Sequence, residues 1–168
     1  ISSTLKFLGE LLGVLPVDTN KNIRIGLISY EVPTVAGTLN PERLDILGYD
    51  MDDNSLIIFE LKGPHADKVE LENLFLQGME HRNWLEENKM AVKLGFEGPI
   101  GKRINTRKRV KLVLGFCGDI VPPLFQDLKA QALRRDRHLL IEFCRFIPPD
   151  RLGGQVELVN FLTADKPS

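Results

Sequence analysis

The chain has 168 residues, of which 43% are apolar and 27% are charged, which is the composition of one soluble globular domain. We therefore expect a single domain over residues 1–168, large enough to fold without disulfides or a structural metal. The apolar runs are too short to cross a bilayer, which argues against any membrane partner, and the formal net charge of −1 says little about other partners.

The first half of the chain is predicted to hold one helix and three strands. Leucines recur at helical spacing over residues 3–12, and the Ile-rich segment 23–30 alternates in part as a strand does. A second strand is predicted over residues 43–49. The Asp, Asn and Ser residues between 50 and 55 predict a tight turn, which joins this strand to the next one, at 56–62, as an antiparallel hairpin.

The strand at 56–62 carries two opposite signals. Its first four residues are all apolar, which predicts that both of its faces are covered and that it lies in the centre of a sheet flanked by helices. The charged residues Glu60 and Lys62 at its end do not fit such a buried position. This conflict marks the end of the strand as a candidate functional site.

The second half of the chain is predicted to alternate helices and strands around one basic segment. The helices fall at 67–88 and 122–135, the strands at 110–117, 138–146 and 155–162, and the basic loop or extended arm at 102–109. The order α-β-β-β-α-β-α-β-β predicts an α/β fold, with a mixed sheet and helices packed against it.

Three charged side chains are predicted to converge at one end of the hairpin. Strand pairing can bring Asp45 next to Glu60, and Glu60 and Lys62 share one face about 7 Å apart along their strand. Two carboxylates suit Mg²⁺, which keeps several waters and takes further ligands from a substrate phosphate. A metal of this kind acidifies a water molecule, and the ammonium of Lys62 could orient it. The plainer alternative is a surface ion pair at the end of a strand.

At these residues the sequence resembles a known family. Asp45, preceded by Arg43 and Leu44, and the apolar run that ends in Glu60-Leu61-Lys62 resemble the second and third motifs of the PD-(D/E)XK nuclease superfamily. The resemblance covers residues 5–88, with Leu44 where the family's name has Pro. It implies a restriction-endonuclease-like α-β-β-β-α-β core and hydrolysis of phosphodiester bonds, most simply in DNA, with Mg²⁺ or Mn²⁺ as the cofactor.

The resemblance also assigns metal ligands. By analogy with the family, Asp45 and Glu60 bind the metal, the backbone carbonyl of Leu61 adds a ligand, and an acidic residue of the first helix completes the site. Glu10 is the candidate for that last role. Its alternative is an ordinary charge on the solvent face of a helix.

Two further residues are assigned to the reaction itself. In the family, the residue that corresponds to Lys62 serves the attacking water, and a Gln on the following helix, matched by Gln77, steadies the lysine or the water. Gln77 could equally be a polar residue on an exposed stripe. Four residues later stands His81, where some subfamilies carry Tyr. The histidines show no zinc-ligand spacing with the cysteines, which argues against zinc.

The basic segment has two interpretations. It is either a solvated loop or, next to a phosphodiesterase site, a surface that neutralises nucleic-acid phosphates. The residues concerned are Lys102, Arg103, Arg107, Lys108 and Arg109.

The remaining expectations concern the setting of the protein. Cys117 and Cys144 lie in apolar strands, as free thiols do, and the start of the chain lacks a signal-peptide pattern, so we expect a cytoplasmic protein. Because the sequence begins with Ile1, it is also compatible with a fragment of a longer protein. A homodimer is expected, since enzymes of this fold often cut two strands. The rival functions are a catalytically inactive module for nucleic-acid binding or assembly, and an interaction domain.

Overall fold

A computed structural model of the chain describes residues 15–18, 21–23, 25–33, 43–62, 66–116, 122–147 and 157–160. The helix predicted over residues 3–12, and with it Glu10, lies outside these residues, as does Cys117. Cys144 is a buried free thiol, as predicted, and its burial raises the pKa of the thiol to about 12.

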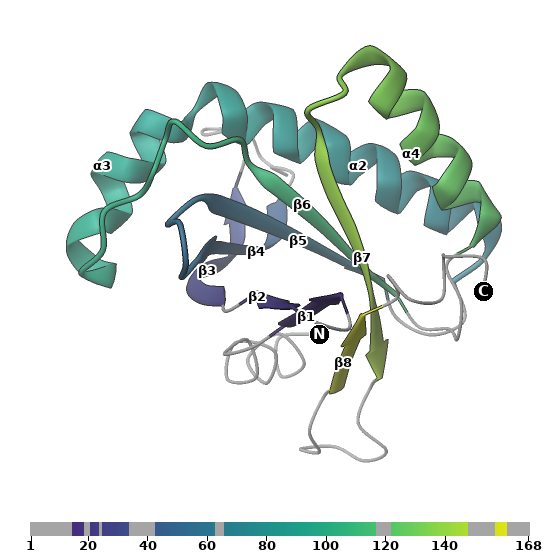
Figure 1. The fold of residues 1–168 in the computed structure, drawn as a ribbon, viewed down its shortest axis with the longest axis horizontal. Helices are drawn as coiled ribbons and strands as arrows, with labels where there is room; N and C mark the ends of the chain where they lie inside the picture. Colours follow the sequence, from purple (N-terminus) through teal and green to yellow (C-terminus); the bar gives the residue numbers. More distant parts are fainter. Residues whose placement is uncertain are drawn as a thin grey trace.

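A six-stranded mixed sheet forms the centre of the described part of the chain, in the order β3-β4-β5-β6-β7-β8 (Figure 1). The strands are β3 (Ile25–Pro33), β4 (Arg43–Asp50), β5 (Leu56–Lys62), β6 (Lys111–Phe116), β7 (Leu140–Ile147) and β8 (Glu157–Asn160). Strands β3, β4 and β5 are antiparallel neighbours, β5, β6 and β7 run parallel, and β8 is antiparallel to β7. The predicted α/β class and the mixed sheet are therefore confirmed.

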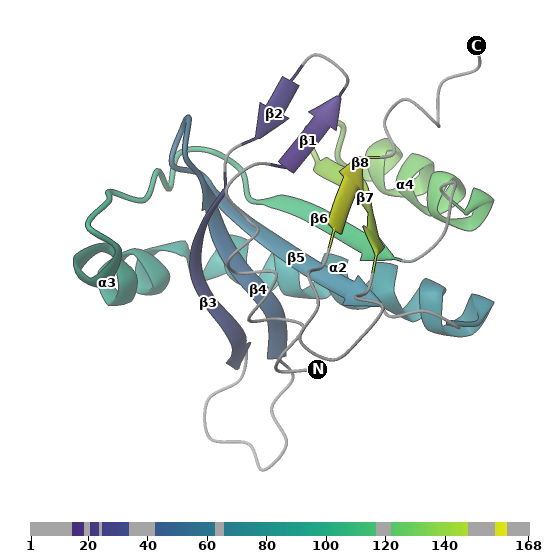
Figure 2. The same ribbon diagram turned by 90° about the horizontal axis from the view of Figure 1, so that it is seen from below.

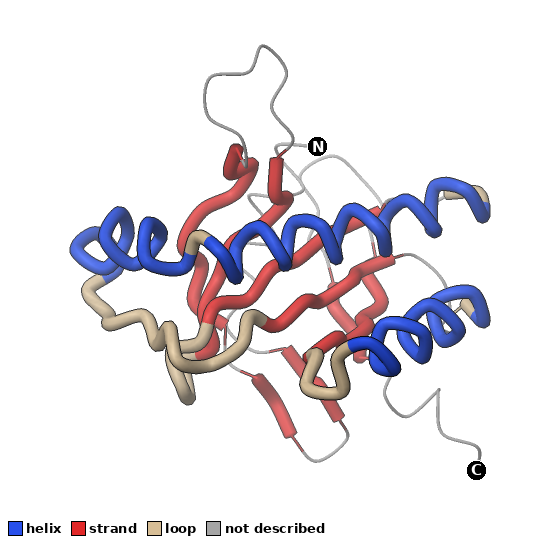
Figure 3. The backbone as a smooth tube through the Cα atoms, turned by 90° about the horizontal axis from the view of Figure 1, so that it is seen from above, coloured by secondary structure: helices blue, strands red, loops and turns tan. Residues whose placement is uncertain are grey.

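In the described ranges, three helices cover one face of this sheet or extend from it. They are α2 (Lys68–Glu87), α3 (Lys89–Ile100) and α4 (Pro123–Arg135). Figure 3 shows α2 and α4 side by side over the strands, with α3 continuing from α2 beyond the sheet. The helices α2 and α3 connect β5 to β6, and α4 connects β6 to β7. Each connection is a crossover, because it joins two parallel strands. Seen from below, in Figure 2, the strands lie in front of α2.

A separate hairpin, β1 (Leu15–Asp18) with β2 (Lys21–Ile23), precedes the sheet and was not predicted from the sequence. Its strands are too short to produce a clear alternation of apolar and polar residues. None of the helices in the described ranges combines the length and the apolar character that crossing a membrane requires.

The boundaries of α2 follow from local capping. The side chain of Asp67 accepts a hydrogen bond of 2.8 Å from the backbone N–H of Glu70, which satisfies one donor of the first turn. The helix ends at Asn88, whose backbone N–H donates to the Trp84 and Leu85 carbonyls. The predicted range of 67–88 is thus correct to about one residue. The helix α3 was missed, because Gly95, Gly98 and Pro99 lower its helix propensity.

The core lies between the sheet and the helices α2 and α4. An aromatic cluster is centred on Phe125 of α4, whose ring centroid lies 5.0 Å from that of Phe116, 5.6 Å from Phe143 and 5.9 Å from Phe75. On β5, all four residues of the apolar run at 56–59 are at most 1% exposed. Both faces of this strand are therefore covered, as predicted.

One glycine sets how closely α2 approaches the sheet. A Cβ atom at Gly78 would lie 3.0 Å from Leu114 Cδ2 and 3.2 Å from Leu112 Cδ1, so a larger residue would press on β6. This close approach brings the side chains of α2 within reach of the end of β5, where the charged residues stand.

Candidate functional site

Asp45 of β4 and Glu60 of β5 meet at the same end of the hairpin. The antiparallel register pairs Ile46 with Phe59, so the next pair along the two strands brings Asp45 opposite Glu60 on the face that α2 covers. Both residues border one cavity, where burial and the negative charge of Asp45 raise the pKa of Glu60. The convergence expected for these two residues is thus present in the structure.

Asp45 is fixed by the backbone of the neighbouring strand. Its Oδ2 accepts a hydrogen bond of 2.7 Å from the backbone N–H of Leu61. Burial raises the pKa of the Asp45 carboxyl above its ordinary value, and the hydrogen bond from Leu61 opposes this rise. The side chain therefore has one set orientation, with Oδ2 directed at β5.

Glu60 is the most perturbed carboxyl group of the site. The residue is only 3% exposed, and burial raises its pKa to about 7, with a further contribution from the negative charge of Asp45. The hydrogen bond from His81 acts in the opposite direction. Near neutral pH, Glu60 is therefore divided between its protonated and ionised forms. A buried carboxyl group with such a pKa is a frequent mark of a functional site.

His81 is a buried residue of the site that was not selected from the sequence. It lies on α2, is 4% exposed, and its Nδ1 is hydrogen-bonded to Glu60 Oε1. The spacing offered a signal, since His81 follows Gln77 by four residues and so lies on the same face of the helix. A search for zinc-ligand spacing does not detect a histidine that contacts a carboxyl group on another element.

Lys62 stands at the exposed side of the site. Its Nζ lies 3.4 Å from Glu70 Oε2, and the two side chains are 39% and 46% exposed. Such an exposed ion pair contributes little to stability and exchanges readily with solvent or a ligand. The Lys62 ammonium thus lies at the surface, and Lys62 stands two residues beyond buried Glu60 on the same face of β5.

A cavity of about 270 Å³ opens at this end of the hairpin. Five residues that the sequence singled out border it: Asp45, Glu60, Leu61, Lys62 and Gln77. The other lining residues are Arg43, Glu70, Asn73 and Leu74. Gln77 is exposed on α2 and lines the cavity, so its side chain is available to a ligand there. The structure thus gathers residues of two strands and one helix around one polar opening.

The donors present suit a hard divalent cation. Asp45 and Glu60 offer carboxylate oxygens side by side, and Mg²⁺ is typically held by one or two carboxylates together with waters. Within the residues that the structure describes, no group of three or more His, Cys, Asp or Glu side chains could hold a metal ion. Metal binding by Asp45, Glu60 and the Leu61 carbonyl, with Glu10 outside the described ranges, stays a prediction.

The basic segment lies at the other end of the hairpin. Its Asn105 N–H donates to the carbonyl of Asn54, in the β4-β5 turn, and Lys111 pairs with Asp50 next to that turn. Because β5 starts there and ends at Lys62, the segment does not border the cavity. The expectation that these basic residues lie next to the carboxylates is therefore corrected, since the sequence alone does not say at which end of a strand the loop packs.

The basic residues themselves are exposed on an irregular segment, as predicted. They are Lys102, Arg103, Arg107, Lys108 and Arg109. Arg109 Nη1 lies 2.5 Å from Asp136 Oδ2, at the end of α4. Whether the segment contacts nucleic acid stays a prediction.

Comparisons with known proteins add one distant likeness. No protein-family model and no curated protein matches the sequence. Among solved structures, the chain is similar to SfsA from Pyrococcus furiosus in complex with Ca²⁺, with a TM-score of 0.33 and 16% sequence identity. The match covers 92% of this chain and 57% of that chain, so this chain spans a little over half of its length.

Proposed function

We propose that the chain is a nuclease with a restriction-endonuclease-like core, which hydrolyses phosphodiester bonds in DNA with Mg²⁺ or Mn²⁺. The observation that carries the proposal is one polar cavity, which Asp45 and Glu60 line from adjacent positions of paired strands and which Lys62 also lines. Two adjacent buried carboxyl groups repel each other when both are ionised. A divalent cation between them would remove this repulsion and replace the proton that Glu60 holds near pH 7.

Each residue then has a defined task. Asp45 and Glu60 would hold the metal, which when bound supplies a more acidic water and charge stabilisation at the phosphate. The Lys62 ammonium, at the exposed side of the cavity, would orient the attacking water and balance the charge on the phosphate oxygens. Gln77 lines the same cavity and would hydrogen-bond the lysine or the water. His81 would fix the orientation of Glu60 through its hydrogen bond to Glu60 Oε1.

A second function is supported by a specific contact. Glu60 Oε1 is already hydrogen-bonded to His81, and burial favours the protonated carboxyl group, which is a poor metal ligand. A nuclease fold in which His81 has taken the place of the metal would be a catalytically inactive module for nucleic-acid binding or assembly. The two functions differ in whether a divalent cation displaces the proton of Glu60.

The nuclease proposal is tested with supercoiled DNA and the purified chain. We expect Mg²⁺-dependent nicking that Asp45→Asn and Lys62→Ala each reduce by a factor of about 100 or more, as loss of a catalytic group does. The matched controls are Glu80→Gln and Lys68→Ala, exposed residues of α2 that do not line the cavity, and both should cut like the parent. Equal cutting by Asp45→Asn and the parent would remove this mechanism.

The inactive-module alternative is tested by calorimetry with Mn²⁺. Binding that Glu60→Gln abolishes supports the metal site, whereas no binding by the parent supports the alternative. Because metal binding must release the proton of Glu60, the affinity of the working site should rise between pH 6 and pH 8, around the pKa of about 7. An affinity that is constant over this range would contradict a role for Glu60 as a ligand.

We also propose that the basic segment contacts the DNA backbone away from the cut bond. The seven residues of β5 separate it from Lys62 by roughly 20 Å, a span that a DNA duplex covers easily. Arg107→Glu together with Lys108→Glu should weaken DNA binding and its salt dependence, while Mn²⁺ binding stays unchanged. Unchanged DNA binding by this variant would assign the segment to the solvated surface.

A further inference from the structure

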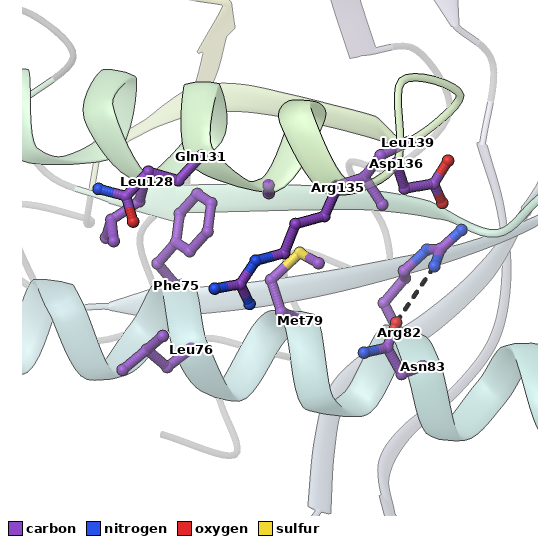
Figure 4. Close-up of a pocket in the computed structure, with 11 residues that line it drawn as sticks. Phe75, Leu76, Met79, Arg82, Asn83, Leu128, Gln131, Arg135, Asp136 and Leu139 are labelled. Carbon is purple, nitrogen blue, oxygen red and sulfur yellow. Dashed lines mark hydrogen bonds between the residues drawn. The ribbon is translucent and has the colours of Figure 1, made fainter.

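A second cavity lies between α2 and α4, on the helical layer of the molecule. It has a volume of about 430 Å³ and shares no lining residue with the cavity at the end of β5. Figure 4 shows its walls, with Phe75, Leu76 and Met79 on α2 facing Leu128 and Gln131 on α4. The size lies in the range of small-molecule sites, and the walls are mostly apolar.

The charged lining of this cavity begins with a buried arginine. Arg82 is 5% exposed, and its Nη1 donates to Asn83 Oδ1 at 3.2 Å. Its Nη2 lies 3.6 Å from Glu86 Oε2, and within the described part of the chain neither Nε nor Nη2 has a hydrogen-bond acceptor. A buried guanidinium with unused donors is costly, so this end of the cavity favours an anionic acceptor.

The nearby carboxylates are already engaged by other cations. Glu86 pairs with Lys89 and accepts a hydrogen bond of 2.8 Å from the Val110 N–H. Asp136, which also lines the cavity, has its Oδ2 2.5 Å from Arg109 Nη1. Arg82 therefore shares both of these carboxylates with other cations.

A second arginine completes the cationic lining. Arg135 is exposed in the last turn of α4, and in Figure 4 its guanidinium extends between the helices, beside Met79. Arg82 and Arg135 thus stand on opposite walls, and Figure 4 shows their guanidinium groups at opposite ends of the cavity, with Met79 between them. A guanidinium group binds a carboxylate through two parallel hydrogen bonds, so the exposed Arg135 is suited to hold an organic acid.

We propose that this cavity binds a small amphipathic carboxylate. The carboxylate would bind the guanidinium of Arg135, and its hydrocarbon or aromatic body would pack on Phe75, Met79 and Leu128. The apolar walls would bind the hydrocarbon part of the ligand. The positive charges of the two arginines would favour a carboxylate over a neutral or positive group.

The test uses decanoate as the probe and NMR of the ¹⁵N-labelled chain as the readout. Titration should move amide signals of α2 and α4 at residues around the cavity, and decyltrimethylammonium, with a hydrocarbon chain of nearly the same length and the opposite charge, should not move them. Arg135→Gln should weaken decanoate binding about fivefold, which is what an exposed charge pair contributes. The matched control is Arg134→Gln, an equally exposed neighbour that does not line the cavity and should leave the affinity unchanged.

A further variant tests whether the hydrocarbon part of the ligand occupies the cavity. Ala132 also lines the cavity, and Ala132→Phe should fill the space and abolish binding while the chain stays folded, as checked by the remaining amide signals. The proposal is overturned if decanoate does not bind or moves signals elsewhere. It is equally overturned if decyltrimethylammonium binds as well, or if Arg135→Gln behaves like Arg134→Gln.

Discussion

His81 of α2 and Glu60 of β5 are hydrogen-bonded through Nδ1 and Oε1, at a place where both residues are almost fully buried. The contact joins the central strand to the long helix, and it holds the carboxyl group that has the most perturbed pKa of the site. A polar pair in such surroundings depends on both of its members, because either one alone would be left in an apolar environment.

Loss of the imidazole should therefore destabilise the fold. We expect His81→Ala to lower the free energy of unfolding by about 1–3 kcal/mol, the range found when a buried polar group loses its partner. His81→Asn, whose amide nitrogen can take the place of Nδ1, should recover part of this loss. Urea denaturation at pH 7 measures both variants. As a control, His138→Ala, at an exposed position, should stay within about 0.5 kcal/mol of the parent. Equal stabilities of the two alanine variants would contradict the importance of the buried pair.

Stability should fall as the pH rises from about 4.5 to about 7. The pKa of Glu60 is raised from its ordinary value of 4.5 to about 7, so the folded chain keeps a proton that the unfolded chain releases in this range. The retained proton stabilises the folded chain by on the order of 3 kcal/mol. This stabilisation is fully present below pH 4.5 and is lost as the pH rises through 7. The raised pKa of Asp45 acts in the same direction.

Urea denaturation between pH 4.5 and pH 8 tests this dependence. Glu60→Gln imitates the protonated carboxyl group and should flatten the profile, whereas Glu80→Gln on the exposed face of α2 should leave it unchanged. A parent chain whose stability increases steadily over this range would contradict the assignment of a raised pKa to Glu60.

Two glycines in helices should respond in opposite ways to the same substitution. At Gly95 of α3 a Cβ would meet nothing within 4 Å, so Gly95→Ala should stabilise the chain by about 0.5–1 kcal/mol. At Gly78 of α2 a Cβ would lie 3.0 Å from Leu114, and the strain on β6 should cancel or exceed this gain. Thermal unfolding of both variants is the measurement, and a Gly78→Ala variant as stable as Gly95→Ala would show that α2 can move away at no cost.

The ion pair next to the β4-β5 turn should be important for folding. Lys111 Nζ lies 2.6 Å from Asp50 Oδ2, and Asp50 is 4% exposed. Lys111→Met removes the cation that, within the described residues, pairs with this buried carboxylate, and it should cost about 3–5 kcal/mol. Lys108→Met, at an exposed position of the same segment, is the control and should change little. Urea denaturation distinguishes the two, and similar small losses would mean that Asp50 finds another partner.

Much of the central sheet could be predicted because its signals are local. The strand β5 was predicted with its observed bounds, since a fully apolar run, a polar turn before it and Gly63-Pro64 after it mark its limits. The helix α2 was predicted almost to the residue because Asp67 is a good N-cap. The helix α3 was missed because its glycines and Pro99 resemble a loop, although its Lys93 and Glu97 form an ion pair at helical spacing.

The site was predictable only in part, for a reason of geometry. The meeting of Asp45 and Glu60 follows from the pairing of adjacent strands in a hairpin, which the sequence indicates. The position of His81 depends on how α2 packs across β5. The position of the basic segment depends on whether the chain returns to the start or to the end of β5 after α3. Both are long-range relationships, and neither propensity nor spacing encodes them.

The hydrogen bond from the Leu61 amide to Asp45 has a consequence for spectroscopy. An amide that donates to a carboxylate changes its proton and nitrogen frequencies when that carboxylate takes up a proton or a cation. The resonance of this single amide is thus a built-in indicator of the charge on Asp45, and it can follow titration or ion uptake without a label at the site.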